Sequence, residues 1–285
     1  MIEPVLKDEA FLEDVTRART AEPDRLHLWW LGQSGFLVLW QGHSLLLDPY
    51  LSDSLTHKYA GTDKPHVRMT ARVIAPERLD FIDVVTSSHN HTDHLDGETL
   101  GPLLQANPAM DLLVGEANRE FASQRLAVSP ERLTGLRLGE PLDRAGYTFQ
   151  AIPAAHETLE NDPQGHPRCI GLVVQAGPWI IYHSGDTLRY PGMETWLRRR
   201  PVDLALLPVN GRDPRRGVPG NLSGPEAVQL ARDSGLGLVV PCHYEMFEFN
   251  SVSPQAFVQA AEQAGQPYRL LHSGERISLH EKKLN

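Results

Sequence analysis

The sequence predicts an α/β fold in which helices cover β-sheets, and three observations support this prediction. Short apolar runs bounded by turn residues recur along the chain, as expected for buried strands. Helix start and stop signals lie between these runs, and strand-rich stretches at 26–50 and 136–185 alternate with them. With 285 residues, of which 41% are hydrophobic, the chain is long enough to bury a sizeable core. We therefore expect a single domain that spans residues 1–285.

Six of the apolar runs end in a polar or metal-ligand side chain. The runs are LLLDP (45–49), FIDVVTSSHNHTDH (81–94), FQAIPAAHE (149–157), WIIYHSGDT (179–187), LALLPVNGRD (204–213) and LVVPCHYE (238–245). Their polar ends are Asp48, the histidine cluster, His156, Asp186, Asn210 and His243. In α/β sheets, ligand-binding side chains converge beyond the carboxyl ends of the strands. The six endings therefore predict one site assembled from distant segments of the chain.

Helices are predicted in the intervals between these strands. The capping box SGPE (223–226) begins a helix that runs to about residue 233. Another helix begins at SP (253–254), with proline at its first position, and runs to about residue 264. Residues 116–125 are predicted to be helical as well. The segment 52–76 is rich in Lys, His, Thr and Arg and is predicted to be a long loop that covers or shapes a site.

Composition and charge exclude several classes of protein. No apolar run is long enough to span a membrane, and the acidic, amphipathic N-terminus is unlike a secretory signal. The cysteines, Cys169 and Cys242, are too few for a disulfide framework. A formal net charge of −9 argues against a general nucleic-acid binder. We expect a cytoplasmic protein that binds neither nucleic acid nor membrane, and a homo-oligomer is compatible with this composition.

The stretch HNHTDH (89–94) places three histidines and one aspartate at the end of an apolar strand. His89 and His91 are two residues apart, so in extended backbone their side chains point to the same side. Neutral imidazoles bind zinc and other first-row metals well, but they leave the charge of a dication uncompensated. Asp93 and Asp186 supply the missing negative charge. This crowding therefore predicts a metal site.

The spacing H-x-H-x-D-H resembles the signature of the metallo-β-lactamase superfamily, in which the motif follows a buried strand. Further motifs resemble that family in the same order along the chain. LLLDP resembles its early aspartate motif, IPAAH its third histidine, HSGDT its bridging aspartate and PCHYE its last histidine. The resemblance implies an αββα sandwich, with two mixed β-sheets flanked by helices.

The resemblance also implies a set of metal ligands. One metal ion would be held by His89, His91 and His156, a second by Asp93, His94 and His243, and Asp186 would bridge the two. Asp48 would orient ligand side chains or their loop. For His183 an orienting role and ordinary packing are equally good interpretations. The remaining histidines are predicted to be structural or solvent-facing: His27, His43, His57, His66, His166, His272 and His280.

The composition of this ligand set favours two catalytic metal ions over one structural ion. A structural zinc site is closed by four protein ligands and is usually rich in cysteine. The seven candidate ligands include no cysteine and suit a pair of ions with open positions. We expect two divalent ions, zinc or manganese, and iron is compatible with the same ligands.

Within the superfamily, four stretches resemble the L-ascorbate-6-phosphate lactonase group: HLWWLGQSGFLV, YHSGDT, PVNGRDPRRG and VVPCHYEMFEFN. That resemblance implies a metal-bound hydroxide that attacks a lactone carbonyl, with Asp93 orienting the hydroxide or moving a proton. Two alternatives stay open. One is a metal-dependent phosphodiesterase of the N-acyl-phosphatidylethanolamine phospholipase D type, and the other is a non-catalytic metal-binding member of the fold.

The loop 210–217 carries three arginines in a chain that is acidic overall. It follows the apolar run LALLPV and is expected to emerge on the same side of the sheet as the metal site. A guanidinium can hold a phosphate or a carboxylate through two parallel hydrogen bonds. We therefore predict a small anionic substrate, a phosphorylated sugar lactone being one candidate, with Arg212 and Asn210 as binding residues.

Overall fold

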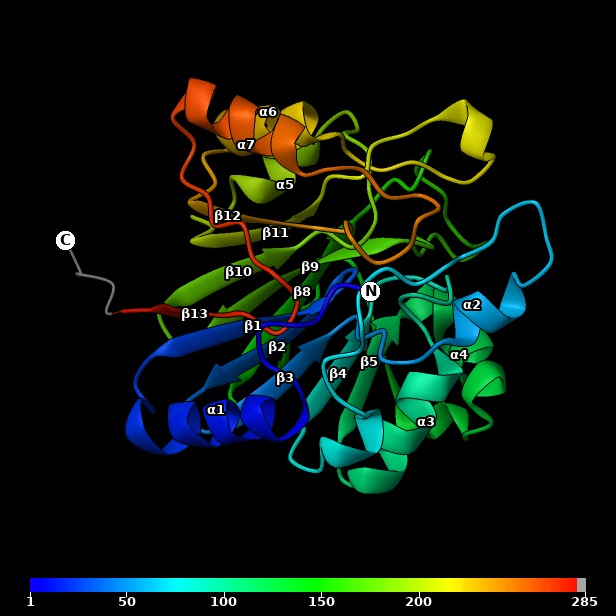
Figure 1. Cartoon of the computed structure of the whole chain (residues 1–285), viewed down its shortest axis with the longest axis vertical. Coiled ribbons are helices and arrows are strands. Elements are labelled where there is room, and N and C mark those ends of the chain that lie inside the picture. Colours follow the sequence, from blue (N-terminus) through cyan, green and yellow to red (C-terminus); the bar gives the residue numbers. More distant parts are fainter. Residues whose placement is uncertain (281–285) are drawn as a thin grey trace.

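Two β-sheets packed face to face form the centre of the computed structural model, which describes residues 1–280. Positions 281–285 of the predicted domain lie outside the described residues. Helices cover the outer face of each sheet, so the layers follow the order α, β, β, α (Figure 1). The αββα sandwich that the family resemblance implies is confirmed.

The first sheet is assembled mainly from the N-terminal half of the chain. Its strands are β1 (Leu26–Gly32), β2 (Gly35–Trp40), β3 (His43–Leu47), β4 (Val84–Ser87), β5 (Asp111–Gly115), β6 (Leu133–Leu136) and β13 (Arg276–Leu279). Within the described residues they form a seven-stranded sheet in the order β13-β1-β2-β3-β4-β5-β6. The pairs from β13 to β3 are antiparallel, and those from β3 to β6 are parallel. The sheet is therefore mixed.

The second sheet is mixed as well. Its strands are β7 (Leu142–Arg144), β8 (Tyr147–Pro153), β9 (Ile170–Ala176), β10 (Trp179–His183), β11 (Leu204–Pro208) and β12 (Leu238–Cys242). Within the described residues they form a six-stranded sheet in the order β12-β11-β10-β9-β8-β7. Pairs from β7 to β10 are antiparallel, and β10, β11 and β12 run parallel. The parallel strands deliver their carboxyl ends to one edge of the sandwich.

Apolar side chains from both sheets fill the space between them. Trp30 and Phe36 of the first sheet belong to the same buried cluster as Phe149 and Leu172 of the second. All four side chains are almost completely excluded from solvent. Burial of this kind contributes roughly 25 cal/mol per Å² of apolar surface, so the shared core holds the two sheets in a fixed relation. That relation fixes where the strand ends meet.

The helices lie on the outer faces. The first sheet is covered by α1 (Asp8–Ala21), α3 (Gly97–Ala106) and α4 (Arg119–Leu126), and the second by α5 (Met193–Leu197), α6 (Gly224–Ser234) and α7 (Gln255–Ala264) (Figure 1). Short 3-10 turns lie at Pro76–Arg78, Glu116–Asn118, Pro130–Arg132 and Pro214–Arg216. None of the helices within residues 1–280 has the length and apolar content that crossing a membrane requires.

The local signals are confirmed, with three differences, the first being that residues 116–118 of the predicted helix 116–125 form a 3-10 turn before α4. The capping box of Ser223 and Glu226 is formed, and Gly235 ends α6 in a left-handed conformation. Pro254 is the N-cap of α7 and not its first residue, so that helix begins at Gln255. The segment 52–76 is not entirely a loop, because residues 54–58 form the short helix α2 (Ser54–Lys58).

Candidate metal centre

The backbone turn after β4 gathers the motif HNHTDH at the carboxyl end of a buried strand. All four residues of β4 are buried, and residues 92–94, a few positions later, form a turn. Backbone N–H groups of His94 and Leu95 both donate to the carbonyl of His91, at 3.1 and 2.8 Å. This tight turn holds the four ligand-type side chains of the motif, three imidazoles and one carboxylate, close together.

Three other strand ends meet this turn. His156 follows β8, Asp186 follows β10 and His243 follows β12. The conformation of His243, with a φ of +65°, lies in the left-handed region and marks an abrupt turn directly after its strand. The inferred convergence of distant strand ends is thus present in the structure.

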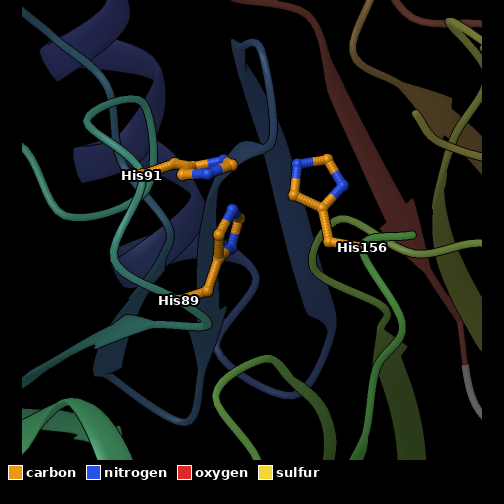
Figure 2. A group of neighbouring side chains, drawn as sticks. All are labelled: His89, His91 and His156. Atoms are coloured by element: carbon orange, nitrogen blue, oxygen red, sulfur yellow. The ribbon is translucent and has the colours of Figure 1, made fainter. Parts of the chain in front are cut away.

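One group of ligand-type atoms consists of histidine nitrogens alone. His89, His91 and His156 each offer a ring nitrogen, and these atoms all lie within 4.8 Å of one another. Figure 2 shows the three rings turned toward a common centre from two different segments of the chain. The ring centroids are 4.6 to 5.2 Å apart, from the pair His89–His91 to the pair His89–His156. Such a cluster of neutral imidazoles suits a first-row metal ion.

A second group combines carboxylates with imidazoles. Asp93, His94, Asp186 and His243 also offer ligand atoms within 4.8 Å of one another. The Nε2 atoms of His94 and His243 both lie 3.3 Å from a carboxylate oxygen of Asp186. Asp186 Oδ2 is also 3.6 Å from Nε2 of His156, which belongs to the first group. Asp186 therefore stands between the two groups.

Buried polar atoms without a hydrogen-bond partner show whether metal ions fit these residues. His89 Nε2, His94 Nε2 and Asp186 Oδ1 are buried and have no hydrogen-bond partner among the described residues. Buried polar groups of this kind are rare because each costs free energy unless something satisfies it. All three atoms are electron-pair donors that belong to the two groups, so divalent metal ions fit the site.

Hydrogen bonds at the ring nitrogen that faces away from the site orient two of the histidine rings. His94 Nδ1 lies 2.7 Å from Asp48 Oδ2, which leaves its Nε2 directed at Asp186. His156 Nδ1 lies 3.0 Å from the carbonyl of Gly220, so Nδ1 carries the hydrogen and Nε2 offers a lone pair. An outer partner of this kind is what fixes the tautomer and orientation of a metal-binding histidine.

Asp48 and His183 have different surroundings. Fully buried Asp48 also accepts hydrogen bonds from the backbone and the hydroxyl of Ser88, so it ties the ring of His94 to the strand end. His183 is 2.9 Å from the Ser34 carbonyl through Nε2 and accepts from the Gly185 N–H at 3.3 Å. It supports the loop before Asp186 through backbone contacts and touches no member of the two groups by hydrogen bond.

The histidine pKa shifts of the two groups have opposite directions. Burial holds the pKa of His89 well below its usual value, and the neighbouring histidines lower it further. Burial also opposes charge on His94, but Asp186 and Asp93 outweigh it and hold the pKa of His94 well above its usual value. The same balance raises the pKa of His243 to about 9. A metal ion in the second group would displace these protons and keep both carboxylates partnered.

Gln33 contacts the second group and was missed in the sequence. Its Nε2 donates to Asp93 Oδ2 at 2.7 Å and lies 3.0 Å from His243 Nε2. It belongs to the turn between β1 and β2 and has a positive φ of 50°. The sequence did contain a signal for this residue, because Gln33 is a polar residue in the GQSG turn directly after an apolar strand. The metal-ligand side chains also follow apolar strands.

A cavity of about 310 Å³ opens above the two groups. Its floor includes His91, Asp93, His156, Asp186 and His243. The predicted 52–76 segment does shape the site, because it contributes Leu55, Lys58, Tyr59, Lys64 and His66 to the wall. Other wall residues are Phe121, Arg125, Val218, Pro219 and Phe247.

The structure does not bring Arg212 into this cavity. Both terminal nitrogens of its guanidinium are engaged by the carboxylate of Glu226, at 2.7 and 3.2 Å. Because Glu226 is fixed in the capping box of α6, Arg212 lines a separate surface hollow there. The predicted anchoring of an anion by Arg212 is therefore not supported by its position.

Asn210 is buried and lies one side chain away from the cavity. Its Nδ2 donates to Asn250 Oδ1 at 3.3 Å, and its Oδ1 accepts from Asn221 at 3.0 Å. Asn250 is the residue that lines the cavity wall. Asn210 therefore braces the wall and does not itself reach the space above the two groups.

Comparison with known proteins agrees with this architecture. Residues 43–244, more than half of the chain, match the family described as the beta-lactamase superfamily domain. A metal-dependent hydrolase from Metallosphaera sedula is 26% identical, and the match covers 88% of this chain and 98% of that protein.

Solved structures share the fold at low sequence identity. Igni18, a metallo hydrolase from Ignicoccus hospitalis, is 21% identical with a TM-score of 0.66, over 90% of this chain and 100% of that one. CmlA, a diiron β-hydroxylase from Streptomyces venezuelae, is 17% identical with a TM-score of 0.66, over 90% of this chain and 54% of that one. The chain belongs to the metallo-β-lactamase superfamily and has the fold of its metal-dependent hydrolases.

Proposed function

We propose that this protein is a two-metal hydrolase that opens a small anionic lactone. The observation that carries the proposal is the pair of ligand groups joined by Asp186 at the floor of a cavity with a basic wall. One ion would be held by His89, His91 and His156, the other by Asp93, His94 and His243, with Asp186 shared. Zinc or manganese ions suit these ligands, and so does iron. Bound there, divalent ions supply a water molecule of lowered pKa and Lewis-acid polarisation of the bond to be cleaved.

Asp93 is the residue best placed to move a proton. It lines the cavity, and its side chain is 15% exposed, in contrast to the fully buried His94. Its contacts with Gln33, His94 and His243 all involve Oδ2. Oδ1 is left to orient a water molecule in the cavity and to accept its proton. The leaving alkoxide of an opened lactone could then receive that proton from the same oxygen.

The wall of the cavity supports an anionic substrate. Lys58, Lys64 and Arg125 line it, whereas its carboxylates are Asp93 and Asp186 of the floor. Lys64 and Arg125 donate to backbone carbonyls, and none of the three cations is paired with a carboxylate among residues 1–280. In a chain with a net charge of −9, this local excess of positive charge favours an anion.

Lys58 is the best placed of these cations to bind the substrate. Its ammonium makes one long hydrogen bond, 3.4 Å from Thr92 Oγ1, and lies 5.1 Å from the ring centre of Tyr59. These weak contacts leave most of its donors free. Lys58 thus takes the anchoring role that the sequence suggested for Arg212.

The proposed setting is a cytoplasmic enzyme whose partner is this small molecule. Cys169 and Cys242 are free thiols, which a reducing compartment would preserve. The basic residues of the cavity wall form a small local group, and we expect no nucleic-acid partner.

The first test counts metal ions. Protein reconstituted with zinc or manganese is expected to hold two ions per chain by elemental analysis, because the two ligand groups are separate. His91→Ala and His243→Ala should each lower the count to about one, since each removes a ligand from a different group. A parent protein with at most one ion, unchanged in His243→Ala, contradicts the two-ion assignment.

The second test concerns Asp93. Asp93→Asn is expected to lower kcat by about 10²–10⁴-fold, because the amide cannot accept a proton. The circular dichroism spectrum and at least one bound ion should be retained. Asp63→Asn, at an exposed position of the 52–76 segment, is the matched control and should keep full activity. Near-normal turnover in Asp93→Asn rejects the assigned role.

The third test identifies the substrate class. Of a panel of lactones, phosphodiesters and β-lactams, a phosphorylated lactone is expected to show the highest kcat/KM. Lys58→Ala should raise KM for it by about 10-fold with little change in kcat, as loss of uniform binding does. Lys7→Ala, far along the chain and paired with Glu3, serves as control. Fastest turnover of a phosphodiester replaces the lactonase proposal with the phosphodiesterase alternative.

A further inference from the structure

His66 has an imidazole ring that is held rigidly in the wall of the cavity. The ring stacks on Tyr59, with centroids 4.5 Å apart and an interplanar angle of 26°. Phe247 meets it edge-on, and Phe249 is tilted against it, each with a centroid separation of 5.1 Å. Thr56 Oγ1 also donates to the backbone carbonyl of His66 at 2.7 Å. Three aromatic neighbours and a backbone anchor therefore fix the position of this ring.

The hydrogen bond at one ring nitrogen sets the tautomer. His66 Nδ1 lies 2.8 Å from the carbonyl oxygen of Lys64. A carbonyl oxygen can only accept, so Nδ1 carries the hydrogen. Burial lowers the pKa of His66, which favours the neutral ring. The other nitrogen, Nε2, consequently holds a lone pair and acts as a hydrogen-bond acceptor.

This acceptor is open to the cavity. His66 lines the cavity together with His91, Asp93 and Lys58. Within residues 1–280, no hydrogen-bond partner is found for His66 Nε2, and the atom is not among the buried unsatisfied ones. His66 also belongs to neither group of metal-ligand side chains. A rigid acceptor that has no partner in the protein and faces a cavity is suited to a ligand.

We propose that His66 is a substrate-binding residue whose Nε2 accepts a hydrogen bond from a hydroxyl group of the substrate. The inference rests on the proposed function and narrows it to a hydroxylated anionic lactone. Lys58 holds the anionic group, and His66 selects for the hydroxyl. The sequence had placed His66 among the structural or solvent-facing histidines, and this proposal gives it a binding role instead.

Substitution of His66 separates recognition from packing. His66→Phe keeps an aromatic ring among Tyr59, Phe247 and Phe249 but removes the acceptor. His66→Gln can place an amide oxygen near the position of Nε2 and should restore part of the lost function. His57→Phe is the matched control, because His57 lies on the exposed face of α2 and does not line the cavity.

The probes are two pairs of small molecules. Gluconolactone and δ-valerolactone differ in their hydroxyl groups and report on hydrolysis. Gluconolactam and δ-valerolactam resist hydrolysis and report on binding alone, by calorimetry with the metal-reconstituted protein. We expect the parent to prefer the hydroxylated member of each pair and His66→Phe to lower that preference by about 3- to 10-fold. His66→Gln should recover much of the preference, and His57→Phe should keep all of it.

The two pairs distinguish failure of this proposal from failure of the lactonase proposal. If lactones are not hydrolysed but His66→Phe weakens gluconolactam binding selectively, His66 keeps its role and the lactonase proposal fails. An unchanged preference in His66→Phe overturns the role of His66, and so does equal loss of activity toward both lactones. Absence of measurable binding for both lactams overturns it as well. NMR of labelled ring nitrogens gives an independent check, since hydrogen on Nε2 of His66 contradicts the proposed acceptor.

Discussion

The structure depends on gathering seven ligand-type side chains in one place, four of them buried, without leaving their charges unbalanced. A carboxylate or an imidazolium taken out of water is costly unless a partner of opposite charge is supplied. Asp186 meets this constraint by approaching His94, His156 and His243 at once. It follows β10, which has paired strands on both sides, so its backbone cannot shift without disturbing the second sheet.

Residues outside the seven ligand-type side chains orient those side chains through hydrogen bonds. A histidine ring can turn over about its χ2 axis, and only a partner on the outer nitrogen decides which nitrogen faces inward. Asp48 supplies that partner for His94, and the carbonyl of Gly220 does so for His156. Gln33 holds the carboxylate of Asp93 in a similar way. Strand ends therefore bring the ligands together, while the adjoining turns orient them.

The wall of the cavity comes from different parts of the fold than the floor, whose residues follow the ends of β-strands. It comes from the segment 52–76, from α4 and from the loops near residues 218–219 and 247–251, which lie outside the main sheet ladders. Hydrogen bonds between these segments hold the wall together, among them the bond from Lys64 Nζ to the Gly217 carbonyl and the β-bridge between Arg68 and Phe247. Loops of this kind can change without disturbing the core. In the proposed function, the metal ligands of the floor are thereby separated from the residues of the wall that would choose the substrate.

The sequence by itself determined the elements with local signals: the capping box of α6, the apolar strands and the H-x-H-x-D-H motif, with the family resemblance extending the ligand set. These signals depend on spacing within a few residues, so a single chain displays them. Only the tertiary structure decided which loops meet above the floor. It paired Arg212 with Glu226, and it placed Gln33 beside Asp93 and His66 in the cavity wall. Such contacts depend on strand order and on the paths of long loops, which bring together residues that no local pattern relates.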